Sequence, residues 1–319
     1  MPAGNDIKDR IASVKNVKQI TRAMEMVAAA RLRKAEQRIE ALRPYAEALR
    51  KMTQRAVAAA ERLPDLPLLE EHDSIDRVGL LLVTGDRGLA GSFNSQIIRA
   101  AERRAKELQR EGQQAAWYVI GAKGASSLTF RGYDVEGTYT GFTDRPAYAN
   151  AREVGQEMIS AYTDGNIDRA ELFYNGYISP MSQDVRHETL MPLQQADFYG
   201  GGDDDDDEES SEDEGRSSSS DSGDDSDGPD HSRALWIYEP EPGEILRQLA
   251  PDYVEISIYR AMLESTASEH GARMTAMRSA SDNATEMIDD LTMQANRERQ
   301  AQITQEIMEV VSGAEATTG

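Results

Sequence analysis

The run STASEHGARMTAMRSASDNATEMIDDLTMQANRERQ, residues 265–300, decides the fold of this chain. Small or apolar residues recur along it at alternating intervals of four and three, a spacing typical of a coiled-coil seam. The seam consists of Ala267, Met274, Met277, Ala284, Ile288, Leu291 and Ala295, together with the polar His270 and Ser281. No proline occurs after Pro251. The stretch 257–313 therefore predicts one helical rod of roughly 80–90 Å, longer than an ordinary domain is wide.

A second long helix is predicted from Asp6 to about Leu63, because the stretch is rich in strong helix formers. Its apolar seam is interrupted by Lys18, Thr21 and Glu25. The seam residues are Ile7, Ile11, Val14, Ala28, Leu32, Ala35, Ile39 and Leu42, and a second apolar face carries Val17, Ile20, Met24 and Val27. Such a helix changes partners along its length or touches two at once. We expect Pro44 to kink or interrupt the helix, and Pro64 and Pro67 to end it.

The two helices lie at opposite ends of the sequence, which favours an antiparallel pair closed by a domain between them. The alternative is that each packs on that domain as an ordinary surface helix, but both are long for this role. The predicted organisation is an N-terminal coiled-coil helix over residues 1–65, an α/β domain over 76–245 and a C-terminal coiled-coil helix over 246–319.

The middle of the chain predicts a Rossmann-like α/β domain with a partly parallel sheet. The run VGLLLV, residues 78–83, is apolar without a break, as buried parallel strands are. The other expected strands are Ala116–Ile120, Ala170–Tyr177, Val185–Leu190 and Ala234–Glu239, and the expected helices are Asn94–Gln109, a helix beginning near Gly121 and Gly124, and Asn150–Tyr162. Tyr133, Tyr139 and Phe142 are interpreted as core or loop aromatics.

Residues 200–233 form an acidic insertion in this domain, with fifteen Asp and Glu against two Arg. Almost no side chain in it suits a core, so we expect it to be disordered. The sign reverses from Asp6 to Arg55, where thirteen Lys and Arg stand against six Asp and Glu. A basic arm in a chain of net charge −22 needs an anionic partner or an internal mate, and the overall acidity argues against nucleic acid.

Several kinds of chemistry are excluded or disfavoured by the composition. The chain has no cysteine, and its four histidines are scattered without metal-ligand spacing. No stretch approaches eighteen consecutive apolar residues, and the N-terminus resembles neither a secretory signal nor a transit peptide. The acidic run lacks the spacing of a calcium loop. We therefore expect no catalytic, cofactor or metal site.

The turn TGDRGLAG, residues 84–91, is the one stretch that suggests an enzyme. Gly85, Gly88 and Gly91 follow a strand and precede a helix, where backbone amides bind phosphate. Their spacing fits neither common nucleotide motif, however, and a tight turn explains the glycines without a ligand. The methionines of the two long helices are open to two interpretations, as coiled-coil filler or as a surface that repacks against changing neighbours.

Three stretches resemble the gamma subunit of F-type ATP synthases. Residues 7–35, IKDRIASVKNVKQITRAMEMVAAARLRKA, resemble its N-terminal helix, and TGDRGLAGSFN, residues 84–94, resembles the first strand–turn of its middle domain. The end, ITQEIMEVVSGAEA, resembles the C-terminal signature of that family. The signature positions are Ile303, Thr304, Glu306, Glu309, Gly313 and Ala314. The resemblance covers the chain except for the acidic insertion.

The resemblance implies a non-catalytic central-stalk rotor that couples proton-driven ring rotation to ATP synthesis or hydrolysis in the beta subunits. The implied partners are the hexamer of alpha and beta subunits, the epsilon subunit and the c-subunit ring. The implied location is the cytoplasmic side of a bacterial cell membrane, reached only through the complex. The residues implied to meet the hexamer are Arg22, Met24, Glu25, Arg31, Arg33, Lys34, Arg273, Arg299, Gln300, Thr304 and Glu306, and Ile307–Ala314 is implied to sit in an apolar sleeve.

Alternatives remain open from the sequence. A nucleotide-binding enzyme would use the turn at Gly85–Gly91, and a free-standing coiled-coil adaptor with an α/β domain would be stable alone. The acidic insertion is either a spacer or an electrostatic brake that competes for basic groups. The direction of operation, the coupling ion, the ring size and the organism do not follow from the sequence.

Overall fold

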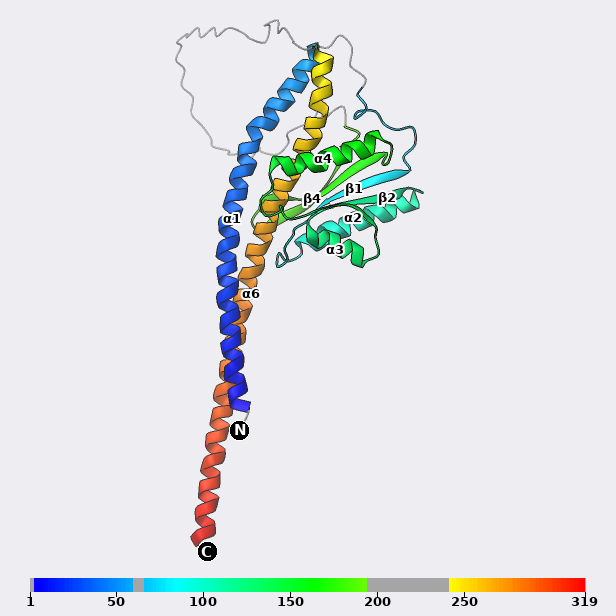
Figure 1. The fold of residues 1–319 in the computed structure, drawn as a ribbon. Coiled ribbons are helices and arrows are strands. Elements are labelled where there is room, and N and C mark those ends of the chain that lie inside the picture. Colours follow the sequence, from blue (N-terminus) through cyan, green and yellow to red (C-terminus); the bar gives the residue numbers. More distant parts are fainter. Residues whose placement is uncertain (1–2, 60–65, 194–240, 319) are drawn as a thin grey trace, which may run out of the picture.

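The computed structural model describes residues 3–59, 66–193 and 241–318. Two long helices, α1 (Ala3–Ala59) and α6 (Pro242–Thr318), lie side by side, and an α/β domain is attached to their flank (Figure 1). The acidic insertion and the expected strand Ala234–Glu239 lie outside the described residues. No described helix is long and apolar enough to cross a membrane.

The two helices run antiparallel, as the resemblance and the chain ends implied. Near the C-terminal end of α1 and the N-terminal end of α6, Leu49 packs with Leu249 and Ile256. Further along, Leu32 and Ala35 pack with Ala267. Beyond that point, Glu25 forms an ion pair with Arg278. The residue number thus rises on one helix as it falls on the other, which gives the register of an antiparallel pair.

The predicted seams are confirmed by burial. On α6, the small or apolar seam residues Ala267, Met277, Ala284 and Leu291 are buried, and so are the polar seam residues His270 and Ser281. On α1, Ile7, Thr21, Ala28, Leu32 and Ala35 are buried. The interval of four and three therefore marks the side that each helix turns to its neighbour.

The structure contradicts one of the two outcomes expected at Pro44, the interruption of α1, while α1 does bend in its C-terminal part (Figure 1). The helix α1 continues through Pro44 without interruption, because the exposed proline costs one backbone hydrogen bond while the turns on either side remain packed on α6. Pro251 lies inside α6, as the predicted bounds 246–319 allowed, but the helix begins earlier than expected, at Pro242. Proline suits this first position, where its missing amide would have no helical partner. The described part of α1 ends at Ala59, before Pro64 and Pro67.

The α/β domain contains a mixed sheet in the order β3-β2-β1-β4-β5. Strands β1 (Arg77–Val83), β2 (Gln114–Ile120), β3 (Val135–Tyr139) and β4 (Arg169–Ser179) are parallel. Strand β5 (Ser182–Met191) pairs antiparallel with β4 at the edge. The expected partly parallel sheet is confirmed, but β3 was missed. Tyr139, expected to be a core or loop aromatic, is the last residue of that strand and is buried in the core.

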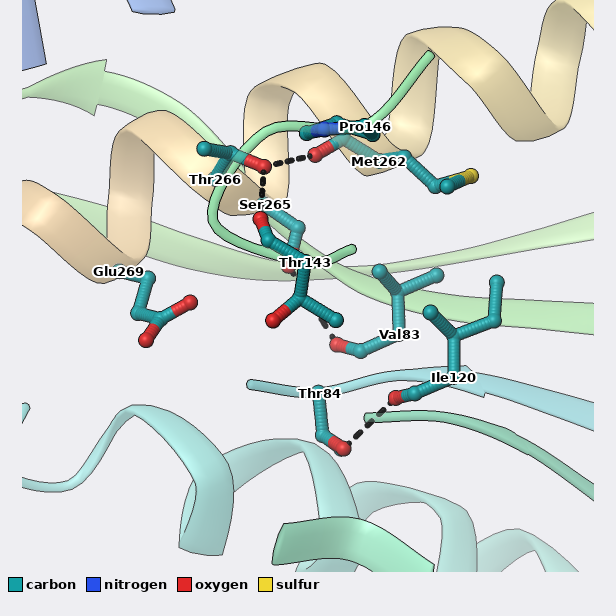
Figure 2. Close-up of a pocket in the computed structure, with 9 residues that line it drawn as sticks. All are labelled: Val83, Thr84, Ile120, Thr143, Pro146, Met262, Ser265, Thr266 and Glu269. Atoms are coloured by element: carbon teal, nitrogen blue, oxygen red, sulfur yellow. Dashed lines mark hydrogen bonds between the residues drawn. The ribbon is translucent and has the colours of Figure 1, made fainter. Parts of the chain in front are cut away.

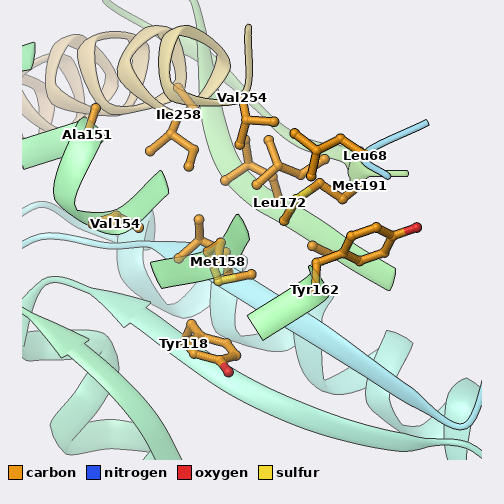
Figure 3. Packing of buried hydrophobic residues seen from close by; sticks show 14 of the residues in the cluster. Leu68, Tyr118, Ala151, Val154, Met158, Tyr162, Leu172, Met191, Val254 and Ile258 are labelled. Carbon is orange, nitrogen blue, oxygen red and sulfur yellow. The ribbon is translucent and has the colours of Figure 1, made fainter. Parts of the chain in front are cut away.

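Three shorter helices cover the two faces of the sheet. Helices α2 (Phe93–Arg110) and α3 (Ala122–Phe130) lie on one face, and α4 (Tyr148–Thr163) lies on the other, beside α6 (Figure 1). Gly124 lies inside α3 rather than before it. The larger core forms on the α4 side, where Met158 and Tyr162 meet Leu172 of the sheet and Val254 and Ile258 of α6 (Figure 3). The N-terminal part of α6 is thus part of the domain core.

A buried ion pair joins α2 to the sheet on its other face. Arg104 donates from Nη2 to Oε1 of Glu171 at 2.9 Å, and Nε2 of His187 lies 2.8 Å from Oε2 of the same carboxylate. Burial acts to raise the pKa of Glu171, but the hydrogen bonds from His187 and Arg104 lower it to about 2. The carboxylate therefore stays charged and holds α2 against strands β4 and β5.

Candidate functional site

The C-terminal end of α6 extends beyond the start of α1, and no other described element lies beside it (Figure 1). Every side chain from residue 299 to 308 is exposed. These exposed residues include Ile303, Ile307 and Met308, and Val310 farther on is 72% exposed. Apolar side chains gathered on one exposed helical end indicate a surface that another chain covers.

The start of α1 presents a second exposed apolar face. Val17, Ile20, Met26 and Val27 are each more than half exposed, although they lie on a helix whose other side packs against α6. The second apolar face predicted from the sequence is therefore present. Met24, predicted to belong to it, is half-buried instead.

Most of the predicted contact residues are exposed on these two helical ends. The exposed ones are Arg22, Arg33, Lys34, Arg299, Gln300, Thr304 and Glu306. The signature positions Glu309, Gly313 and Ala314 lie within α6, but their side chains are outside the described set. The structure thus gathers the basic residues of α1 beside its exposed apolar face, and the polar residues of α6 along its free end.

Three of the predicted contact residues have ion-pair partners within the chain. Nε of Arg278 donates to the Oε1 of Glu25 at 3.0 Å across the helix pair. Nη1 of Arg31 donates to Oδ2 of Asp144 at 2.6 Å, which ties α1 to the loop between β3 and α4. The third, Arg273, is nearly buried, and it forms the centre of the junction between α6 and the sheet.

At this junction Arg273 is held on three sides. Its guanidinium donates to the carboxylate of Glu269, to the backbone oxygen of Gly88 at 3.2 Å and to Nδ1 of His270 at 3.2 Å. Glu269 and His270 are 2% and 1% exposed. Burial is the main cause that raises the pKa of Glu269, and burial together with the nearby Arg273 lowers the pKa of His270 to about 4. The histidine is therefore neutral near pH 7 and accepts the hydrogen bond from Arg273.

The first two amides of the glycine-rich turn, and the carboxylate that it carries, are bound by groups of the same domain. Asn94 accepts a hydrogen bond from the amide of Gly85, and Thr143 accepts one from the amide of Asp86. The carboxylate of Asp86 in turn accepts from the amides of Ala122, Gly141 and Thr143. A Cβ at Gly85 would lie 2.9 Å from the carboxylate of Glu269. A phosphate would have to displace these carboxylates, so this turn is a structural joint rather than an anion site.

The space between the turn and α6 is too small for a nucleotide. A cavity of about 10 Å³ is lined by residues of β1, β2, α6 and the loop before α4 (Figure 2). Within it, Oγ1 of Thr266 donates to the backbone oxygens of Met262 at 2.7 Å and Thr143 at 2.9 Å. The bond to Thr143 fixes α6 to the loop. Among the described residues, no cluster of histidine and acidic side chains suits a metal ion.

Sequence reasoning missed the acidic half of this junction. Asp86 and Asp144 bind groups on other elements and Glu269 binds Arg273 of its own helix, but none of the three stands out by spacing. The available signal was local: Glu269 and Arg273 are four apart on a helix, as pairs on one helical face are. Their neighbour His270 lies on the predicted seam, and the seam predicted that this part of the helix packs against another element.

A long antiparallel helix pair with an exposed apolar and basic end, and an α/β domain fixed to its flank, defines a stalk-shaped class of protein. The family model described as ATP synthase matches residues 3–317. The ATP synthase gamma chain of Moorella thermoacetica is 40% identical over 311 residues, covering 98% of each chain. That of Geobacter metallireducens is 40% identical over 319 residues, covering all of both chains. The chain belongs to the ATP synthase gamma chain family.

Solved structures agree on the fold. A chain from the Euglena gracilis mitochondrial ATP synthase matches 98% of this chain with a TM-score of 0.65 and 18% identity, covering 94% of its own length. A chain from the Tetrahymena thermophila mitochondrial ATP synthase central stalk and c-ring structure matches 82% with a TM-score of 0.56 and 23% identity, covering 99% of its own length. The full-length similarity to the curated gamma chains favours this family over a free-standing adaptor.

Proposed function

We propose that this chain is the central rotor stalk of an F-type ATP synthase. The helix pair enters the hexamer of alpha and beta subunits, and the α/β domain sits at the foot beside the epsilon subunit and the c-subunit ring. Rotation of the ring turns the helix pair, and each orientation of this asymmetric shaft favours a different beta-subunit conformation. A difference in contacts between orientations is what shifts nucleotide affinity.

The observation that carries the proposal is the free end of α6. Residues 299–308 are exposed, apolar side chains occur among them, and no described element covers them. In the proposed complex the apolar side chains meet a sleeve of the hexamer, and Arg299, Gln300, Thr304 and Glu306 meet polar groups below it. The unbranched, flexible Met308 among them suits a bearing that needs similar contact energy at every angle.

The proposed hexamer contacts of α1 follow from exposure. Arg22, Arg33 and Lys34 are exposed and basic, and half-buried Met24 lies beside them, so this face suits acidic loops of the beta subunits. Glu25, Arg31 and Arg273 have partners within the chain, so we assign them first to holding the helices in position.

We further propose that the chain performs no chemistry of its own. The glycine-rich turn, where a nucleotide would bind, is occupied by hydrogen bonds of Asp86, Asn94 and Thr143. The proposed location is the cytoplasmic face of a bacterial cell membrane, where the chain is held through the other subunits, with no role for nucleic acid.

Co-expression with the alpha and beta subunits of the same genome tests this function. We expect a single copy of the chain to elute with the alternating ring on size exclusion, and ATP hydrolysis by the ring to depend on it. A variant with Arg33→Glu and Lys34→Glu should weaken that dependence, whereas Lys51→Glu, an exposed cation at the foot end of α1, is the matched control. If the chain elutes alone and has no effect on hydrolysis, the rotor function is wrong and the free-standing adaptor is the favoured function.

A further inference from the structure

Helix α2 carries a stripe of basic side chains that have no acidic partner in the described part of the chain. Arg99, Arg103, Lys106 and Arg110 follow one another at intervals of four, three and four, so they lie on one side of the helix. All four are exposed. Other basic residues nearby are paired: Arg104 binds Glu171 and Arg131 binds Glu102. In a chain of net charge −22, four adjacent unpaired cations are unusual.

This basic stripe forms one wall of a groove. Gln96, Arg99, Arg103 and Lys106 line it from α2, together with Glu102, whose carboxylate is already bound to Arg131. The other wall is the edge strand β5, with Gln183, Asp184 and Val185. The volume is about 690 Å³, and the groove is open to solvent along its length. It is large enough for an extended peptide and too open for a small buried ligand.

We propose that this groove binds the acidic segment of the same chain, residues 203–214. The sequence there is DDDDDEESSEDE, in which ten of the twelve residues are acidic and none is basic. A peptide with carboxylates at nearly every position can meet cations that are spaced along a helical stripe whatever its exact register. The charge of the groove and that of the segment are therefore complementary.

The point at which the segment leaves the domain places it within reach of the groove. Strand β5 runs from the groove toward Leu193, the last described residue before the segment. At the rise of a strand, the distance from Leu193 back to Val185 in the groove is about 26 Å. Nine residues lie between Leu193 and Asp203, and the ten steps along the chain span at most about 33–36 Å when fully extended. The first aspartate therefore reaches the groove without any change in the domain.

The return path is also long enough. Residues 215–241 lie between the acidic segment and the start of α6 at Pro242, and they span up to about 90 Å. Leu246, near that start, shares an apolar cluster with Met191 at the end of β5. The segment thus leaves and re-enters the domain beside the same core cluster. Such a tether supplies the acidic residues at millimolar effective concentration, which a separate acidic protein would have to match.

Carbodiimide cross-linking of the full chain, assembled with its alpha and beta subunits, tests the proposal. This reagent joins a lysine to a carboxylate that it already touches, and Lys106 is the lysine of the stripe. We expect the main product within the chain to join Lys106 to the 203–214 segment. The exposed lysines Lys51 and Lys123 serve as internal controls, and raising the salt concentration should lower the yield because exposed ion pairs are screened.

A pair of charge reversals then separates specific docking from general attraction. The Arg99→Glu and Arg103→Glu double variant should lower the Lys106 yield by about fivefold, the factor expected for two exposed ion pairs. The matched control reverses Arg145 and Arg247, which are exposed cations outside the groove, and should leave the yield unchanged. Equal products from Lys51, Lys123 and Lys106 would overturn the proposal, and so would a Lys106 product with another subunit or a second copy. Neither result depends on whether the chain is a rotor.

Discussion

Replacing Arg273 with leucine is expected to lower the free energy of unfolding of the chain by about 3–5 kcal/mol, because the variant leaves a buried carboxylate without its cation. Glu269 is 2% exposed and forms its ion pair with Arg273 inside the junction of α6 with the sheet. The backbone oxygen of Gly88 loses its donor as well. Denaturant unfolding followed by tryptophan fluorescence measures the change, in a Trp236→Phe background so that buried Trp117 of β2 is the only reporter.

The double variant Glu269→Leu with Arg273→Leu decides the cause. With both charges removed, stability should return to within about 2 kcal/mol of the starting protein, because two apolar residues replace a buried pair without an orphan charge. Arg278→Leu is the matched control on the same helix. It breaks the exposed pair with Glu25 and should cost no more than about 1 kcal/mol. A double variant as unstable as the Arg273 variant would contradict the account of the junction.

Acidification from pH 6.5 to 4 is expected to cost about 3 kcal/mol of stability through His270 alone. The pKa of this histidine is about 4 in the folded chain, against an ordinary value of 6.5, because burial and the nearby Arg273 disfavour the imidazolium. Below pH 6.5 the unfolded chain binds the proton first. Stability therefore falls as the pH falls through this window, and the loss is complete once the folded form is protonated too.

The variant His270→Gln isolates this titration. Glutamine retains a hydrogen-bonding group beside Arg273 but does not titrate, so the difference between the two stability curves reports His270 and not the acidic groups around it. Those groups include Glu269 on the same helix and Asp144 on the facing loop, with Arg31 of α1 beyond it. Parallel curves for the two proteins between pH 6.5 and 4 would show that the histidine is not buried in this way.

The parts of the fold that periodicity encodes were predictable. Apolar residues at intervals of four and three indicate the side of a helix that packs against another helix. The pairing side of α6 therefore followed from residues such as Met277, Ala284 and Leu291. The apolar run of β1 likewise indicated a buried parallel strand. Strand β3, in contrast, has the sequence VEGTY, which is short and half polar. It lies at the edge of the sheet, where it pairs with β2 alone, so its own sequence carries little strand signal.

The junction was less predictable because its specificity comes from contacts between distant segments. From the sequence, Arg273 is a basic residue of the predicted C-terminal helix, and the resemblance to the gamma subunit implied that it contacts the hexamer. Its actual surroundings depend on the glycine-rich turn, 185 residues away, which brings the backbone oxygen of Gly88 to it. Helical spacing indicates which face a residue occupies, but not whether a loop or solvent lies opposite that face.

A direct observation of rotation tests the central claim. The chain contains no cysteine, so Ser126→Cys, at an exposed position on α3, gives a single attachment site on this subunit for a bead. The alpha and beta ring is fixed to a surface, and ATP is added. The account predicts that the bead turns in one direction while ATP is hydrolysed and stops when ATP is removed. A bead that stays still while the same complexes hydrolyse ATP would show that this chain is not the rotor.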